Sequence, residues 1–113
     1  MRLEAKKYLF DIQRALQLLR QFSAGGTYEQ YTADALLRSA VERQFEVIGE
    51  ALGQLLKLEP SLSSRISEYQ RIIAFRNILI HGYADVDDQV VWGVIESKLP
   101  VLVREIEALV AEA

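Results

Sequence analysis

The chain has 113 residues, of which 50% are hydrophobic and 26% are charged, and its formal net charge is −3. This composition fits a single globular domain over residues 1–113 and excludes a disordered chain. The negative charge argues against a general nucleic-acid coat protein, and the absence of cysteine excludes disulfides, thiolate catalysis and cysteine-based zinc sites.

The first residues, MRLEAKKYLFDIQRAL, carry charges where a signal peptide would be apolar. No stretch reaches the roughly 20 uncharged apolar residues that span a bilayer. We therefore expect a cytoplasmic protein without a membrane segment.

Apolar residues recur at helical spacing along most of the chain, and no segment reads as a strand. The spacing predicts a first helix from about Arg2 to Phe22, which the glycine pair in residues 23–26 ends. Thr27 and Gln30 have the spacing of a capping box, so a second helix is expected from there to about Leu58.

Two glycines, Gly49 and Gly53, lie four residues apart on the second predicted helix. Each costs about 1 kcal/mol of helix stability relative to alanine. Because both lie on one face, they indicate a close helix crossing, within the fold or across a dimer, rather than two tolerated glycines.

A stripe of glutamates, Glu42, Glu46 and Glu50, follows the same helix at intervals of four. Like charges at that spacing repel slightly, so a basic partner such as Arg71 or Arg76 is expected opposite them. A solvated face is the alternative, and a role as acid–base groups is the less favoured one.

Two further helices follow a break at Pro60. One is predicted from Ser64 or Ser67 to Ile80, and because its second half is apolar nearly all round, it should be buried on most sides. Gly82 is expected to stop it. The last helix should begin at an aspartate cap, Asp85 or Asp87, and bend near Lys98 because Pro100 lacks a backbone donor. The pattern predicts an all-α, up-and-down bundle of four to five helices.

Polar residues interrupt the most apolar helix, in the run RNILIHGY at residues 76–83. Arg76 and Asn77 stand among apolar residues, His81 is the only histidine, and Tyr83 follows on the exit loop. Arg76 and His81 are about 140° apart around a regular helix, so they converge only if the helix end unwinds or a second subunit completes the site.

These residue types suit RNA cleavage without a metal ion. Histidine acts as general base or general acid near neutral pH, and arginine stabilises the charge that develops on a phosphate. Asn77 could orient His81 or donate to the phosphate. The alternative is structural: His81 as a helix-end cap and Arg76 as an ion-pair partner of a glutamate on the second helix.

The run R-x4-H-x-Y, together with AVERQFEVIGEAL at residues 40–52 and the final segment VDDQVVWGVIESKLPVLVREI, resembles HepT-like proteins of the HEPN superfamily. The similarity covers most of the chain in the same order. It implies a HEPN helical bundle, usually a homodimer with a cleft between the subunits.

The resemblance also implies an activity, a metal-independent endoribonuclease without cofactors that is the toxin of a type VII toxin–antitoxin pair. The partner would be an MNT-type nucleotidyltransferase antitoxin. Arg76 and His81 match the family's catalytic pair, Asn77 matches the polar position after the arginine, and Tyr83 matches the tyrosine that the antitoxin modifies with AMP. The competing interpretation is a non-enzymatic helical dimer that binds and regulates the nucleotidyltransferase.

Two other interpretations are weaker. Asp85, Asp87 and Asp88 could bind a metal, but helix capping is favoured, and one histidine without cysteine does not build a usual zinc site. Trp92 and Tyr69 could stack on RNA bases, but core or interface packing is favoured.

Overall fold

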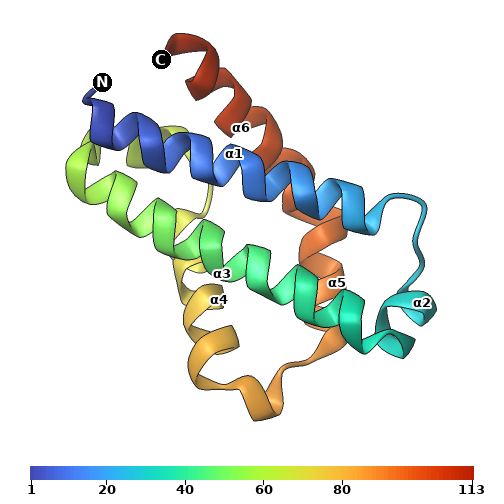
Figure 1. Cartoon of the computed structure of the whole chain (residues 1–113). Coiled ribbons are helices and arrows are strands. Elements are labelled where there is room, and N and C mark those ends of the chain that lie inside the picture. The colour runs from blue at the N-terminus through green and yellow to red at the C-terminus, as the bar shows by residue number, and fades with distance from the viewer.

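The computed structural model describes residues 1–113 and contains helices and no strand (Figure 1). The all-α prediction is therefore confirmed. No helix combines the length and the apolar character that crossing a membrane requires. The elements, in chain order, are α1 (Leu3–Ser23), α2 (Tyr28–Ala33), α3 (Ala35–Leu58), the 3₁₀-helix η1 (Pro60–Arg65), α4 (Tyr69–His81), the 3₁₀-helix η2 (Tyr83–Asp85), α5 (Asp88–Ser97) and α6 (Leu99–Glu112).

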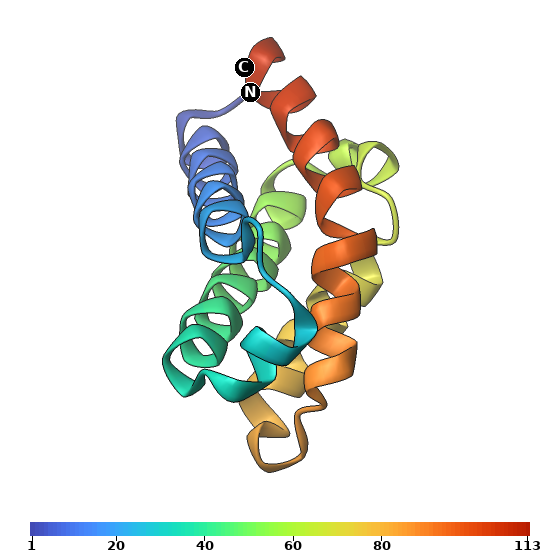
Figure 2. The same cartoon turned by 90° about the vertical axis from the view of Figure 1, so that its right-hand side faces the viewer.

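The two long helices α1 and α3 pack against each other and form the centre of the bundle. Helix α6 covers α1, and α5 packs against α2 and continues into α6 with a bend. Both termini lie at one end of the molecule, and the turn from α4 through η2 to α5 lies at the other end (Figures 1 and 2). The core consists of 23 buried hydrophobic residues, with no buried polar or charged residue.

The predicted second helix is divided at Asp34, which the sequence analysis missed. The capping box is present: Gln30 N–H donates to Thr27 Oγ1 at 3.2 Å, and Thr27 N–H donates to Gln30 Oε1 at 3.0 Å. However, the helix that it starts ends at Ala33. Asp34 is extended and caps α3, since its carboxylate accepts the N–H of Leu37 at 3.1 Å. An aspartate that bonds a nearby backbone N–H favours a helix start over a helix interior.

The break before the last helix is confirmed, because α5 ends at Ser97 and α6 begins at Leu99 with a proline in its first turn. Asp87, the second of the two proposed caps, is the one used, and its carboxylate accepts the N–H of Gln89 at 2.8 Å.

The start of α4 lies later than predicted. The helix begins at Tyr69, and Glu68 before it has a positive φ of 54°. Ser67 does not cap the helix. Its N–H and hydroxyl both donate to the Glu105 carboxylate on α6, the hydroxyl at 2.7 Å. The glutamate at 68 also forms an ion pair with Lys98. The segment leading into α4 is therefore fixed to the region where α5 meets α6.

The burial of α4 is the main difference from the prediction. Only Leu79 is fully buried on this helix, and Ile78 is 55% exposed. Helix α4 packs mainly against α3. The apolar second half that was expected to be buried on most sides packs closely only against α3, since α4 makes few contacts with the other helices of this chain.

The two glycines of α3 differ in how closely another helix approaches them. A Cβ on Gly49 would lie 2.3 Å from the Cβ of Arg76 and 2.8 Å from its Cγ, whereas a Cβ on Gly53 would meet nothing within 4 Å. The predicted close crossing within the fold is confirmed at Gly49, whereas at Gly53 no helix of this chain approaches and a crossing within a dimer stays a prediction. Two helices that cross at an angle approach closest at one point only.

We expect opposite effects from alanine at these two positions. Gly49→Ala should lower the free energy of unfolding by about 1–3 kcal/mol, because α3 and α4 must move apart. Gly53→Ala should leave it unchanged or raise it by up to about 1 kcal/mol through helix propensity. Urea denaturation of both variants provides the measurement, and equal effects at the two positions would contradict the crossing.

Candidate functional site

Arg76 is held at the crossing of α3 and α4. Its Nη2 lies 3.2 Å from Glu50 Oε2, and its Nη1 donates to Asn77 Oδ1 at 2.9 Å. Its Nε is buried and has no hydrogen-bond partner. The side chain as a whole is 26% exposed. The guanidinium therefore lies at the surface with both terminal nitrogens in contact with neighbouring oxygens.

A row of four polar side chains crosses from α3 to α4. Gln54 Nε2 donates to Glu50 Oε1 at 3.2 Å, so each carboxylate oxygen of Glu50 has one partner. The row continues through Arg76 to Asn77. Asn77 was expected to orient His81 or to donate to a phosphate, but here its carbonyl oxygen accepts from Arg76.

His81 and Tyr83 lie on the turn that follows. His81 is the last residue of α4, and its exposed side chain makes no hydrogen bond or ion pair within the chain. Tyr83 begins η2 and is 79% exposed. Both side chains therefore remain accessible to an external ligand.

Arg76 and His81 are not brought together within one chain. Helix α4 does not unwind before His81, and Gly82 N–H closes the last turn by donating to Ile78 O at 2.8 Å. The two side chains thus keep the separation of about 140° of a regular helix. Of the two routes to convergence that the sequence left open, unwinding of the helix end does not occur, and completion of the site by a second subunit stays a prediction.

The glutamate stripe of α3 is used in three different ways. Glu50 contacts Arg76, as the pattern suggested, while Glu46 lies 3.5 Å from Arg43 of its own helix. Glu42 forms no ion pair, and burial, with Asp88 and Glu46 nearby, raises the pKa of its carboxyl. Arg71, the other proposed partner, instead pairs with Glu68 at 3.0 Å.

The aromatic and acidic alternatives have structural roles. Trp92 is buried and its ring centroid lies 5.5 Å from that of Tyr31, so it belongs to the core. Burial also raises the pKa of the Tyr31 phenol. Asp88 accepts a hydrogen bond from Thr32 at 3.0 Å. No three histidine or acidic side chains are grouped so that they could hold a metal ion.

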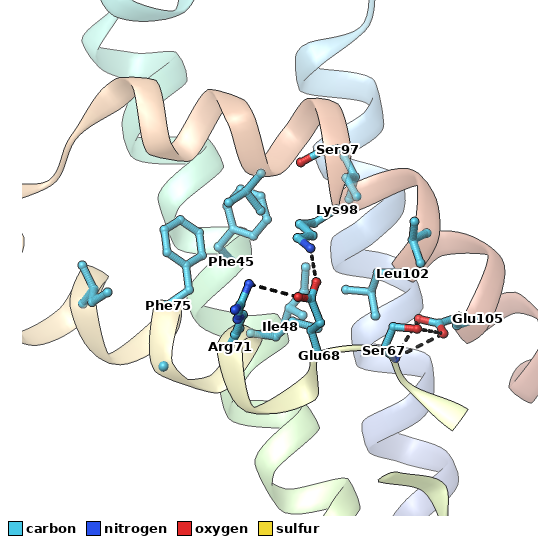
Figure 3. A pocket seen from close by; sticks show the side chains of 16 residues that line it. Phe45, Ile48, Ser67, Glu68, Arg71, Phe75, Ser97, Lys98, Leu102 and Glu105 are labelled. Atoms are coloured by element: carbon cyan, nitrogen blue, oxygen red, sulfur yellow. Dashed lines mark hydrogen bonds and ion pairs between the residues drawn. The ribbon is translucent and has the colours of Figure 1, made fainter. Parts of the chain in front are cut away.

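An apolar groove of about 400 Å³ lies on the side of α4 that faces α5 and α6 (Figure 3). Phe45 and Phe75 meet edge to face on its wall, with ring centroids 5.2 Å apart. Glu68 lies between Arg71 and Lys98 at its rim. Ile78 also lines the groove, one residue along the helix from Asn77.

Two features of this region, the apolar groove and Gln54, were not predicted from the sequence. The groove was missed because apolar spacing predicts that a helix is buried but does not show how closely its neighbours pack against it. Gln54 was missed because it has no charge, although its position four residues after Glu50 places both side chains on one helix face. That spacing was the available signal.

The chain matches known proteins over almost its whole length. The family model described as Ribonuclease HepT-like matches residues 12–109. A protein of Thermococcus cleftensis named "Probable ribonuclease HepT" is 32% identical over 104 residues, which cover 92% of this chain and 94% of that protein. A "Putative RNase" of Methanocaldococcus jannaschii is 26% identical, and one of Caldanaerobacter subterraneus subsp. tengcongensis is 28% identical, each over 104 residues and 92% of this chain, with 94% and 92% of those proteins covered. No solved structure matches the chain significantly.

Proposed function

We propose that this chain, which belongs to the HepT-like ribonuclease family, is a metal-independent endoribonuclease whose catalytic residues are Arg76 and His81. The observation that carries the proposal is the composition of α4 and its exit. A surface arginine, the only histidine and an exposed tyrosine lie within eight residues, in a chain whose relatives are named as ribonucleases.

The proposed reaction is the attack of a ribose 2′-oxygen on the adjacent phosphorus. The bond from phosphorus to the 5′-oxygen of the next nucleotide breaks, and a cyclic phosphate remains. The 2′-hydroxyl proton passes to a base, and the leaving 5′-oxygen receives a proton from an acid. His81 fills one of these roles, since imidazole exchanges protons near neutral pH. Arg76 stabilises the additional charge on the phosphate oxygens.

A homodimer is part of the proposal, because one chain supplies one histidine and holds it away from Arg76. A two-fold axis beside α4 would provide two copies of each group. The apolar groove and the exposed side of α4 support this position for the second copy. An apolar surface of this kind on a soluble chain marks an interaction site.

We further propose that the protein is a toxin whose antitoxin, an MNT-type nucleotidyltransferase, transfers AMP from ATP to Tyr83. The phenolic oxygen attacks the α-phosphorus of ATP, pyrophosphate leaves, and the phenolic proton is released. Tyr83 is exposed and follows His81 by two residues. The new phosphodiester places a negative charge beside the site and repels an RNA backbone.

Cleavage of RNA in EDTA tests the catalytic assignment. We expect the purified protein to cut total RNA and leave cyclic-phosphate ends, and His81→Ala and Arg76→Ala each to reduce the rate by at least about 100-fold. Both variants should keep the parent's circular dichroism spectrum, because His81 is exposed and Arg76 lies at the surface. Cleavage that requires added Mg²⁺, or that survives His81→Ala, would refute the mechanism. A folded parent that binds the nucleotidyltransferase but cuts no RNA would favour the non-enzymatic regulator.

Substitution of Ile78 tests the position of the dimer. Because Ile78 is 55% exposed in the single chain, Ile78→Asp should change the stability of the monomer little, yet it should convert a dimer to a monomer. Leu3→Asp is the control, since Leu3 is 84% exposed but lies on α1, away from the groove. Sedimentation velocity measures both variants. An Ile78→Asp protein that remains dimeric would exclude this surface.

Mass spectrometry tests the modification. Incubated with the nucleotidyltransferase and ATP, the parent should gain the mass of one AMP per chain and lose its RNA cleavage, while Tyr83→Phe should gain none. Tyr69→Phe, at the other end of α4, should be modified like the parent. AMP found on the Tyr83→Phe protein would remove Tyr83 from the model.

A further inference from the structure

We propose that Glu50 is a positioning residue for Arg76. In this role, the Glu50 carboxylate and the missing side chain at Gly49 together fix where the guanidinium lies relative to an RNA phosphate. The inference rests on the proposed function, since it assigns Arg76 to the phosphate. It adds Gly49 and Glu50 of α3 to a proposed site that otherwise lies on α4 and on the turn that follows it.

The base of the Arg76 side chain lies directly against the backbone of α3. Gly49 lets the Cβ of Arg76 approach where any side chain on α3 would collide, at 2.3 Å. The base of the Arg76 side chain is thereby pressed against α3. Its guanidinium then lies within reach of the next residue of α3, which is Glu50.

Both terminal nitrogens of the Arg76 guanidinium have a partner in the chain. Glu50 contacts Nη2 and Asn77 contacts Nη1, so the group is held from two sides. An arginine has five N–H donors. One hydrogen bond and one ion pair leave donors on the terminal nitrogens for an incoming phosphate. Because Nε is buried without a partner, those terminal donors are the ones that an external anion can reach.

Glu50 forms its ion pair with Arg76 at the surface of the molecule. Its side chain is 56% exposed, and exposed ion pairs contribute little to folding stability. Its second oxygen accepts from Gln54 at 3.2 Å, so the carboxylate has a supporting contact of its own besides the one to Arg76. An exposed ion pair with its own supporting residue, directly beside the proposed catalytic arginine, is better explained by orientation of that arginine than by stability.

The test is a double-mutant cycle on a labelled oligoribonucleotide that the parent cleaves. Glu50→Gln should lower the rate at saturating RNA by about 10- to 100-fold, the size expected for a misplaced catalytic group, with a smaller effect on KM and an unchanged unfolding midpoint. In the Arg76→Lys background, the same substitution should have little further effect, since Glu50 acts through the guanidinium. Glu46→Gln is the matched control, because Glu46 also pairs with an arginine, one turn earlier on α3.

A second measurement does not depend on cleavage. The ¹H–¹⁵N resonance of the Arg76 Nε–H, assigned by its loss in Arg76→Lys, should exchange slowly with water in the parent and faster in Glu50→Gln. The Glu46→Gln spectrum should match that of the parent.

The outcomes separate this inference from the proposed function. If Arg76→Ala and His81→Ala cleave RNA like the parent, the catalytic assignment fails. If those variants are inactive but Glu50→Gln is fully active, only the positioning role fails. A faster Glu50→Gln enzyme would overturn the inference in favour of a carboxylate that keeps Arg76 from RNA. Equal effects of Glu50→Gln in the parent and Arg76→Lys backgrounds would overturn it as well, and so would unchanged Nε–H exchange.

Discussion

The close approach of α3 and α4 at Gly49 determines where the polar side chains of α4 lie. Because α3 carries no side chain at this point, α4 can rest on it with the base of Arg76 in direct contact with the glycine position. The face of α4 that carries Leu79 is then buried, and the guanidinium of Arg76 emerges beside Glu50. Helix α4 has few contacts with helices other than α3, and an apolar groove lies between it and α5 and α6. The site and the apolar groove are thus two sides of one crossing.

Local signals in the sequence were read correctly where the interaction is local. The capping box of Thr27 and Gln30, the cap at Asp87 and the break before Leu99 each depend on a few neighbouring residues, and each is present. The break at Asp34 was missed because apolar spacing continues through it and no glycine or proline marks it. There, one side-chain cap outweighs an otherwise continuous helical pattern.

Features that depend on tertiary geometry were predicted only in part. Gly49 and Gly53 are equivalent in the sequence, and only the crossing angle of α4 makes the first indispensable. Arg71 and Arg76 were both possible partners for the glutamates of α3. Arg71 pairs with Glu68 instead, and Arg76 is the one that forms an ion pair with α3, to Glu50. The burial of α4 within this chain was overestimated. Apolar periodicity predicts that a helix surface is covered, but it does not show whether the same chain or another one covers it.

The charges of the protein give an RNA substrate little attraction to the region around Arg76 and His81. Helix α4 carries Arg71 and Arg76 and no acidic residue, yet both arginines are paired with glutamates, and three aspartates follow within seven residues of His81. A chain with a net charge of −3 therefore offers RNA little general attraction. In the proposed mechanism, cleavage depends on the few N–H donors of Arg76 that Glu50 and Asn77 leave unbonded rather than on a basic surface. An enzyme of this kind gains from holding its arginine in a fixed orientation, because a misplaced donor cannot be compensated by tight binding elsewhere. For the proposed modification of Tyr83, the added negative charge would act on a site that has little positive charge to offset it.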